Sequence, residues 1–470
     1  MDKQIVARLR HSLDTHQLPG LAVVIRQNSQ VSFAGGVGCF DSAQLCHATE
    51  NTQYGVASLS KFVTTGLLMR LHERKALSID DLLVQYFPTL RVAQQAPITL
   101  AHLMGHSSGL PGLPGRFYAR NLDDSHDRSG GIGTRGQGNH GVPALGLPDL
   151  PTIVSPPELV DLMNQLELNL LAPPGELLNY SNEGFCLLGG VIEQVTQRAY
   201  PDVVHEEIFA PLQMTQSSIG ESVAPPESAL ALPLLRDGAR YHTGRFWRAP
   251  LFYPAGGCIS SARDIARLIG SLSDDLAAPS SFLSPKSKQR MIHLQMPVAS
   301  RPAPTIGYGL GLEVQQLDTD TTMLWHSGQR AGVSSFMACL LQQHLAISVL
   351  CNVADAPVTT IGHELIGEVL GRPEICWPPA ALAQESCEAT ANLEGMVGSY
   401  ASLEGNRYTV EQSDHGLMLT SQGPQQALPL HFAGADYGTV GMQTFRFLHT
   451  RPTSPARSLA LDLRVLERVA

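Results

Sequence analysis

Residues 57–61 read Ala-Ser-Leu-Ser-Lys, which fits the pattern S-x-x-K at the start of a segment, 58–74, that we predict to be a helix. Positions three apart share a helix face, so the Lys61 side chain can reach the Ser58 hydroxyl. A serine hydroxyl becomes a good nucleophile when a neighbouring base takes its proton, and a partly buried lysine can be that base. Alone, the pattern also fits a capped helix with a surface lysine.

A second candidate group is Tyr180-Ser181-Asn182, which follows Pro173-Pro174-Gly175 and precedes a predicted helix over 184–197. A tyrosine close to cations can accept or donate a proton. The amide of Asn182 can hold a substrate carbonyl or amide, or contact the lysine. By itself this Y-x-N pattern is common.

The third group is His326-Ser327-Gly328, which we expect at the end of a strand over 322–325. A glycine at a strand edge lets a substrate backbone approach closely. In isolation His326 is more simply interpreted as an ordinary core or surface histidine.

In this order the three groups resemble the penicillin-recognising serine hydrolases. The branch is the one that contains class C β-lactamases, D-aminopeptidases, D-Ala-D-Ala carboxypeptidases and family VIII esterases. It has S-x-x-K, then Y-x-N, then K-T-G or H-x-G. The resemblance extends over about residues 5–370 and includes YGVASLSK (54–61), ITLAHLMGHSSGLPG (98–112), PAGGCISSARDIARL (254–268) and HSGQRAGVSS (326–335). The segment after about 390 is similar to the lipocalin-like β domain of some members.

The resemblance implies a role for each position. Ser58 is expected to be the acylated nucleophile, and Lys61 and Tyr180 to share the proton transfers. Substrate binding is expected at Asn182, His326, Ser327, Gly328 and Gln329, with the backbone N–H groups of Ser58 and Gln329 as the oxyanion hole. His326 stands where β-lactamases have a lysine that holds the penicillin carboxylate, so efficient β-lactam hydrolysis is not expected.

The arrangement of predicted elements indicates an α+β fold. Strands are expected over 21–27 and 30–37, joined in a hairpin by Asn28-Ser29, and later over 309–315, 322–325, 335–342 and 345–352. Between them we expect helices, including one over 157–170, one that Ser78 caps and one that Ser261 caps. Strands at both ends of the first 370 residues and helices in the middle favour one antiparallel sheet flanked by helices with an inserted helical region. We predict three parts: a β-lactamase-like domain over 1–370, a linker over 371–390, and a small all-β, barrel-like domain over 391–470. The Gly- and Pro-rich stretch 113–156 is predicted to be a long loop of the binding cleft.

Composition limits the function classes. The chain has 470 residues and a formal net charge of −10, without a run of five basic residues, so nucleic acid and membrane surfaces are poor candidate partners. Its N-terminus lacks the pattern of a signal peptide and its eight cysteines form no CxxC pair. We therefore expect a cytoplasmic enzyme with no cofactor or metal that acts on a small molecule or peptide, and whose oligomeric state the sequence leaves open.

Two further patterns point elsewhere. Residues 105–109 match G-x-S-x-G, but a helix-like segment precedes them and Leu-Pro-Gly follows, so Ser107 is expected in a structural turn and not in a nucleophile elbow. Arg330 could bind a substrate carboxylate, although a solvated loop position is the simpler interpretation.

Three functions remain open at this stage. The first is a serine hydrolase that cleaves an amide or ester, as a peptidase or amidase on D-residues or small peptides, or as an esterase. The second, known among members with a lipocalin-like tail, is a thioesterase or acyltransferase that passes the acyl group to an amine or alcohol, as in nonribosomal peptide cyclisation. The third is a non-catalytic binding module, which the intact Ser58, Lys61, Tyr180 and Asn182 argue against.

Overall fold

A computed structural model describes most of the chain. The described residues are 2–113, 153–220, 230–237, 240–246, 249–273, 282–298, 306–373, 375, 393–414, 416–421, 427–432, 434–440, 443–450 and 454–469. Most of the predicted cleft loop over 113–156 and most of the predicted linker over 371–390 lie outside these ranges.

The central feature is an eight-stranded sheet built from both ends of the first 370 residues. Its order is β2-β1-β14-β13-β12-β11-β10-β9, and every neighbouring pair is antiparallel. The strands are β1 (Gly20–Gln27), β2 (Gln30–Gly38), β9 (Met296–Pro297), β10 (Ile306–Tyr308), β11 (Glu313–Asp318), β12 (Thr321–Arg330), β13 (Val333–Leu340) and β14 (Leu345–Cys351). The predicted α+β class with one antiparallel sheet is confirmed.

The first hairpin follows its turn residues. Strands β1 and β2 are joined by Asn28 and Ser29, whose φ angles are +52° and +63°. Two successive residues with positive φ are typical of a type I′ turn, whose twist matches that of the strands. Asn is one of the residue types that tolerate this conformation, so the hairpin expected at this dipeptide is confirmed.

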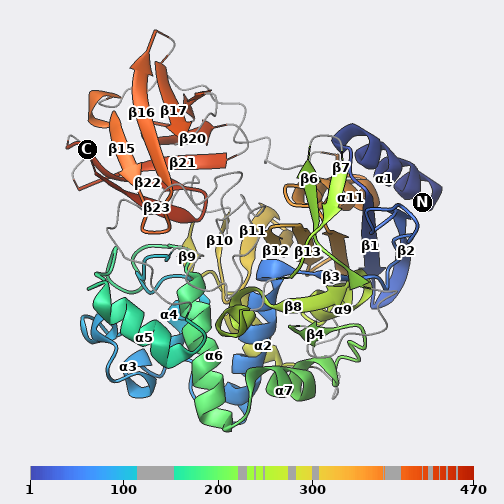
Figure 1. The fold of residues 1–470 in the computed structure, drawn as a ribbon, viewed down its shortest axis with the longest axis horizontal. Coiled ribbons are helices and arrows are strands. Elements are labelled where there is room, and N and C mark those ends of the chain that lie inside the picture. The colour runs from blue at the N-terminus through green and yellow to red at the C-terminus, as the bar shows by residue number, and fades with distance from the viewer. Residues whose placement is uncertain are drawn as a thin grey trace.

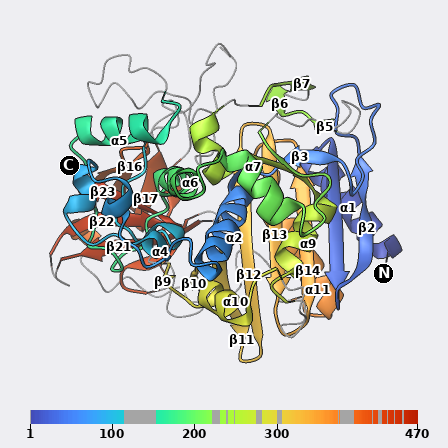
Figure 2. The same ribbon diagram turned by 90° about the horizontal axis from the view of Figure 1, so that it is seen from below.

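The sheet is covered on both faces (Figures 1 and 2). Alternate residues of β1 point to opposite sides: Ala22 and Val24 join one core cluster, while Val23 and Ile25 join the other. The first cluster includes residues of α2 (Ser60–Glu73), α6 (Asn182–Thr196) and α9 (Ala262–Gly270). The second is closed by α11 (Val358–Leu370) and α1 (Asp2–His16). Because both faces are buried, the strand reads as a continuous apolar run.

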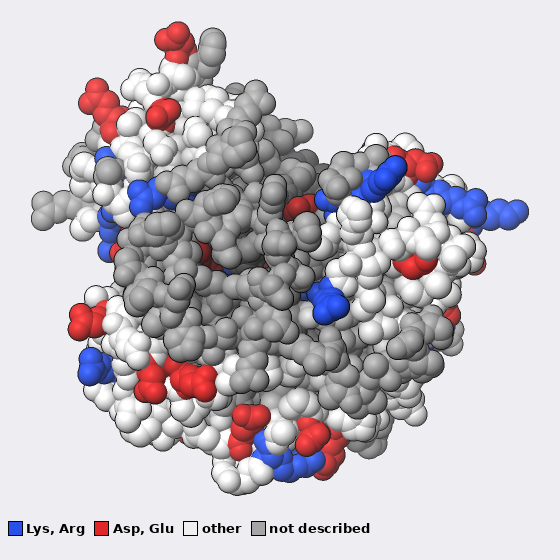
Figure 3. Space-filling model, viewed as in Figure 1, with Lys and Arg blue, Asp and Glu red and all other residues white. Residues whose placement is uncertain are grey.

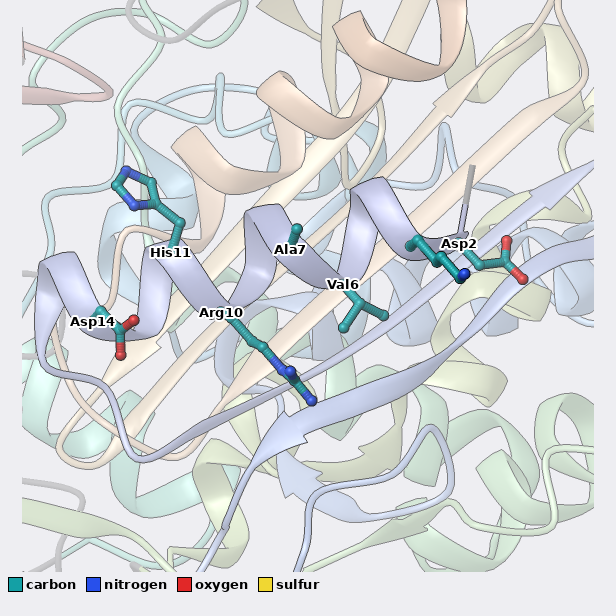
Figure 4. A pocket seen from close by; sticks show the side chains of 7 residues that line it. Asp2, Val6, Ala7, Arg10, His11 and Asp14 are labelled. Carbon is teal, nitrogen blue, oxygen red and sulfur yellow. The ribbon is translucent and has the colours of Figure 1, made fainter.

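Helix α1 has no counterpart among the predicted elements. Among its residues only Ile5, Leu9 and Ser12 are buried. Such a narrow buried stripe produces little apolar periodicity in the sequence, so no helix was predicted there. Figure 4 shows its outer face, with Asp2, Val6, Arg10 and Asp14 along one helix.

Several predicted boundaries differ from the structure. The helix predicted over 157–170 is α5 (Pro156–Gln165) and ends earlier. The helix expected after Ser78 is reduced to one turn, α3 (Leu83–Tyr86). The predicted strand over 309–315 begins only at Glu313, as β11. In contrast, Ser261 caps α9 as expected, since its side chain accepts a hydrogen bond from the Asp264 N–H.

A nine-stranded antiparallel sheet forms the C-terminal part and is nearly closed, which confirms the barrel-like architecture (Figure 1). Its order is β18-β17-β16-β15-β23-β22-β21-β20-β19. The strands are β15 (Gly398–Ala401), β16 (Arg407–Ser413), β17 (Gly416–Ser421), β18 (Leu428–Pro429), β19 (His431–Phe432), β20 (Tyr437–Val440), β21 (Gln443–His449), β22 (Ala456–Leu461) and β23 (Arg464–Arg468). It has a core of its own around Tyr400, Phe445 and Phe447.

The surface visible in Figure 3 carries acidic and basic side chains interspersed over the residues that the structure describes, without a large area of one sign. No described helix is both long and apolar enough to cross a bilayer.

Candidate active site

The candidate nucleophile, Ser58, lies in a short turn that joins a strand to a helix. Strand β3 (Gln53–Gly55) leads into a 3₁₀ turn, Ala57–Leu59, which continues directly into α2. Ala57 has a φ of +46°, an uncommon conformation for a residue with a Cβ atom. Backbone strain of this kind costs energy and is often found at active sites, where it fixes a side chain. Ser58 is half-buried at this turn, at the start of the helical segment as predicted.

Lys61 is fully buried one helical turn further on. Its Nζ lies 3.2 Å from Ser58 Oγ and donates a hydrogen bond to the Ala255 carbonyl at 2.7 Å. Burial, and to a smaller extent the charge of Arg464, holds the pKa of Lys61 well below its usual range. The surface lysine of the alternative interpretation is therefore wrong. A lysine with a free amine next to a serine hydroxyl is suited to accept that hydroxyl's proton.

Tyr180 comes to the same place from the loop before α6. Its ring centre lies 4.8 Å from Lys61 Nζ, and its hydroxyl is buried without a hydrogen bond of standard geometry to the described residues. Burial raises the pKa of Tyr180 above its usual value, while the nearby Ser58 hydroxyl and Arg464 act in the opposite direction. The hydroxyl is therefore protonated at neutral pH and can donate.

Asn182 is the first residue of α6 rather than part of a loop. Ser181 caps this helix by accepting a hydrogen bond from the Gly184 N–H at 3.2 Å, which fixes the turn that carries both Tyr180 and Asn182. The Oδ1 atom of Asn182 is buried and has no hydrogen-bond partner among the described residues. A buried acceptor without a partner is costly, and a substrate N–H would satisfy it.

The H-x-G group lies within β12, not at the end of a strand as predicted, because β12 continues to Arg330. The His326 ring is buried and uses both nitrogens. Nδ1 donates to the Ser327 carbonyl at 2.5 Å, since a carbonyl can only accept, and Nε2 then accepts from the Tyr308 hydroxyl at 2.9 Å. Burial lowers the pKa of His326 to about 3, so the ring is neutral.

Gly328 lies where β12 passes close to the nucleophile turn. A Cβ atom added there would lie 2.4 Å from Ser335 Oγ and from the Val56 carbonyl, and 2.9 Å from Ser58 N. Only glycine fits this position without displacing the backbone. The strand edge and the start of the S-x-x-K helix are thus held together, with Ser327 and the exposed Gln329 on either side.

One positioning residue escaped the sequence analysis. His106 accepts a hydrogen bond from Ser181 N–H through Nδ1 at 3.2 Å, and its carbonyl accepts one from Asn179 N–H at 2.9 Å. Its ring centre lies 4.1 Å from that of Tyr180. The histidine stands in the G-x-S-x-G match, next to Ser107, where α4 (Leu100–Met104) and not a strand precedes it. In this segment the structure therefore places a helix and a turn that supports the Tyr180 loop, and not the strand that a nucleophile elbow requires.

Arg330 is half-buried at the end of a strand, so the loop position expected for it is wrong. Arg330 ends β12, and its guanidinium carbon lies 5.5 Å from the centre of the Phe246 ring. Burial lowers the pKa of its guanidinium to about 10.

Among the residues that the structure places, no three His, Cys, Asp or Glu side chains are grouped so that they could hold a metal ion.

A helix-borne S-x-x-K pair that faces an H-x-G strand of a two-sided antiparallel sheet defines the β-lactamase and transpeptidase class of fold. The chain belongs to the β-lactamase family, since the family model described as "Beta-lactamase" matches residues 5–370. This family contains serine hydrolases of the penicillin-binding-protein type. Solved structures of similar fold include a D-amino acid amidase and EstCE1, a hydrolase with promiscuous acyltransferase activity.

Known proteins resemble the chain over different lengths. It is 24% identical over 437 residues to penicillin-binding protein 4* of Bacillus subtilis (strain 168), covering 87% of this chain and 85% of that protein. The structure of SurE, also solved with D-Leu, matches with a TM-score of 0.73 at 19% identity over 99% of this chain and 98% of SurE.

Two further solved structures are similar in fold. The octameric penicillin-binding protein homologue of Pyrococcus abyssi matches with a TM-score of 0.66 at 23% identity, covering 99% of this chain and 100% of that one. The D-amino acid amidase of Ochrobactrum anthropi SV3, in complex with L-phenylalanine amide, gives 0.59 at 20% identity over 78% and 99% of the two chains.

Proposed function

We propose that the protein is a serine hydrolase that forms an acyl-enzyme on Ser58 and cleaves an amide or ester bond. One observation carries the proposal: a fully buried lysine, whose pKa is held low, places its amine 3.2 Å from a serine hydroxyl. A structural lysine would be paired with a carboxylate, whereas Lys61 donates only to the Ala255 carbonyl and to Ser58 in the part of the chain that is described.

In the proposed mechanism Ser58 Oγ attacks the substrate carbonyl carbon while the neutral amine of Lys61 takes the hydroxyl proton. The resulting tetrahedral oxyanion is held by the backbone N–H groups of Ser58 and Gln329. Tyr180, protonated at neutral pH, gives its proton to the departing amine or alcohol and regains one from Lys61. Water then attacks the acyl-Ser58 carbonyl, and the same two groups handle the protons in reverse.

The substrate would lie along β12. Asn182 Oδ1, buried and unpartnered among the described residues, is proposed to accept a hydrogen bond from a substrate amide. Ser327, Gly328 and Gln329 are proposed to line the strand edge against the substrate backbone. Since both nitrogens of His326 are already engaged, we assign it to the inner wall of the cleft, where its neutral ring offers no charge to a penicillin carboxylate.

Amides of D-residues and small D-residue peptides are the proposed substrates, with simple esters as the next class. The support is that the structures of similar fold include an amidase for D-amino acids and a protein solved with D-Leu.

The first experiment tests the nucleophile. The protein is treated with a fluorophosphonate probe and an activated acyl ester, and its intact mass and peptide map are measured beside Ser58→Ala and Ser107→Ala. A single adduct on Ser58 that is lost only in Ser58→Ala is expected. An adduct on Ser107, or no adduct at all, would contradict the proposal.

The second experiment tests the substrate class. Rates are compared for matched D- and L-amino acid amides and for a p-nitrophenyl ester, with and without a primary amine as competing acceptor. Faster cleavage of the D-amide supports the amidase proposal. A product in which the acyl group is joined to the amine, in preference to water, would assign the protein to acyl transfer instead.

A further inference from the structure

The turn between β22 and β23 of the C-terminal sheet contacts the catalytic tyrosine directly. The Tyr180 N–H donates to the Leu463 carbonyl at 2.9 Å, and the Val465 N–H donates to Asn179 Oδ1 at 3.0 Å. The Leu463 side chain also packs against the small apolar cluster around Tyr308. Figures 1 and 2 show β23 beside the helical region that carries this loop. The C-terminal sheet is therefore joined to the active-site loop at Asn179 and at Tyr180 itself.

Between these two bonds lies Arg464. Its Nη1 donates to the Tyr180 carbonyl at 2.7 Å, and its guanidinium carbon lies 4.9 Å from the centre of the Tyr180 ring. The same Nη1 is paired with the carboxylate of Glu404, and the two side chains are only 18% and 10% exposed. A planar guanidinium presents several N–H donors in a fixed geometry and stacks on aromatic rings, whereas the ammonium of a lysine is a compact charge on a flexible chain.

We infer that Arg464, contributed by the C-terminal sheet, is a positioning residue of the acyl-transfer site that fixes Tyr180 through its carbonyl and its ring. This inference rests on the proposed roles of Tyr180 and Lys61. Tyr180 is the only one of the proposed catalytic side chains that comes from a loop, and Arg464 holds that loop at the residue itself. The C-terminal sheet thus contributes a residue to the site and is not a structurally independent domain.

The charge of Arg464 acts in the same place. Its positive charge lowers the pKa of Lys61 beyond the larger effect of burial, and it also works to lower the pKa of Tyr180. Two groups on α6, Glu183 and Cys186, act to raise the pKa of Lys61. Lys61 in turn acts to lower the pKa values of His106 and of His326 on β12. Arg464 is the one cation among them, because the two histidines have lowered pKa values.

Glu404 shapes how this contact responds to pH. Burial raises its pKa to about 7, and Arg464 opposes that rise while Glu183 adds to it. Gly112 lies against the Glu404 carboxylate, which leaves no room for a side chain there. The pair is therefore enclosed between the C-terminal sheet and the start of the segment after α4.

The test uses the pH dependence of acylation, which a merely structural arginine would not move. Burst release of p-nitrophenol from p-nitrophenyl acetate is followed from pH 5 to pH 10 for wild type, Arg464→Met and Arg464→Lys, with the Ser58 adduct confirmed by mass. Arg468→Met is the matched control. Arg468 lies on the same strand, and the bonds it makes to described residues go to the carbonyls of Gly395, Val397 and Ala456, all in the C-terminal part of the chain and none in the Tyr180 loop.

In Arg464→Met the acid limb of the profile should move up by about one pH unit, the scale on which a neighbouring charge acts, because Lys61 is more easily protonated. The plateau should also fall. In Arg464→Lys the positive charge is kept, so the acid limb of the acylation rate should stay within a few tenths of a pH unit of wild type. The plateau of the acylation rate should fall by roughly 10- to 100-fold, because a hydrogen bond of the guanidinium is lost. KM should change less than the acylation rate in both.

An unmoved acid limb in Arg464→Met, or an equal shift in Arg468→Met, would overturn the inference while leaving the Ser58 mechanism intact. If wild type itself gives no Ser58 adduct, the proposed function fails and the inference falls with it. Should Arg464→Met not fold, Glu404→Gln provides the second variant, because the loss of its carboxylate frees Arg464. Its acid limb should then move to lower pH, and an upward shift would contradict the assigned role.

Discussion

His106 supports Ser181 by accepting a hydrogen bond from its backbone N–H at Nδ1, and this bond sets the turn on which Tyr180 is carried. The His106 backbone has a φ of +53°, a conformation that asparagine adopts more readily than alanine. The histidine is therefore tied to this position by its backbone as well as by its ring.

We expect His106→Asn to retain more activity than His106→Ala. The amide Oδ1 of asparagine can replace Nδ1 as acceptor, whereas alanine leaves the Ser181 N–H buried and unpaired, at a cost of ~1–3 kcal/mol. Because the unpaired N–H would displace the turn that carries Tyr180, kcat should drop by roughly 10- to 100-fold in His106→Ala. Steady-state kinetics with thermal unfolding of both variants checks this. Equal kcat values in the two variants would contradict the hydrogen-bond argument.

Removing Lys61 should abolish acylation and stabilise the fold at neutral pH. The folded state binds fewer protons than the unfolded state between the lowered pKa of Lys61 and 10.5, its ordinary value, so stability rises with pH across that window. Lys61→Met lacks this rise because it has no proton to lose. Urea unfolding from pH 7 to about pH 10.5 measures the difference, with the exposed Lys75→Met as control. A Lys61→Met protein that is less stable at neutral pH than wild type would refute the prediction.

Gly328→Ala should impair catalysis far more than its size suggests. The added methyl group would overlap Ser335 Oγ, the Val56 carbonyl and Ser58 N, so β12 must move away from the nucleophile. Overpacking of this kind costs about 1–3 kcal/mol, and a displacement of the reacting groups can cost about 100-fold in rate.

The matched control for this variant is Gly371→Ala. Gly371 ends α11 with a φ of +66° and has no atom within 4 Å of an added Cβ. It should lose about 1 kcal/mol of stability with unchanged kcat. Full activity in Gly328→Ala would show that the close approach to Ser58 N is unimportant.

Arg330→Met should cost little stability. The Arg330 side chain lies over Phe246 without a carboxylate partner in the described part of the chain, and burial of an unpaired cation is unfavourable. Methionine retains much of the apolar packing and removes the charge. The free energy of unfolding should therefore stay within about 1 kcal/mol of wild type or exceed it. A loss of several kcal/mol would reveal a favourable partner for this cation.

The local signals in the sequence identified the central sheet and the core of the site. Asn28-Ser29 predicted the first hairpin, and S-x-x-K predicted that Lys61 reaches Ser58 by helix geometry alone. The predicted strand over 322–325 is shorter than β12. The second half of β12, from His326 to Arg330, is mostly polar and follows no apolar alternation, so it gives no strand signal. Helix α1 was overlooked because only one narrow stripe of it is buried.

Contacts made across long sequence separations could not be predicted in this way. Arg464 and Tyr180 are 284 positions apart, and neither residue stands in a motif that names the other. His106 was visible only as part of a misleading G-x-S-x-G match, since its function depends on where the Tyr180 loop folds back. A single sequence contains no periodicity or turn signal for such pairings, which only tertiary packing creates.

The order of strands in the central sheet has a consequence for how the protein is made. Strand β1 pairs with β14, and Ala22 lies opposite Leu350. The ribosome therefore synthesises β14, the neighbour of β1 in the sheet, more than three hundred residues after β1. At a translation rate of about 5–20 residues per second, the apolar β1 edge stays unpaired for roughly 15 seconds to a minute. During that interval the nascent chain must be shielded from its neighbours, and its expression should depend on chaperones that bind extended apolar segments.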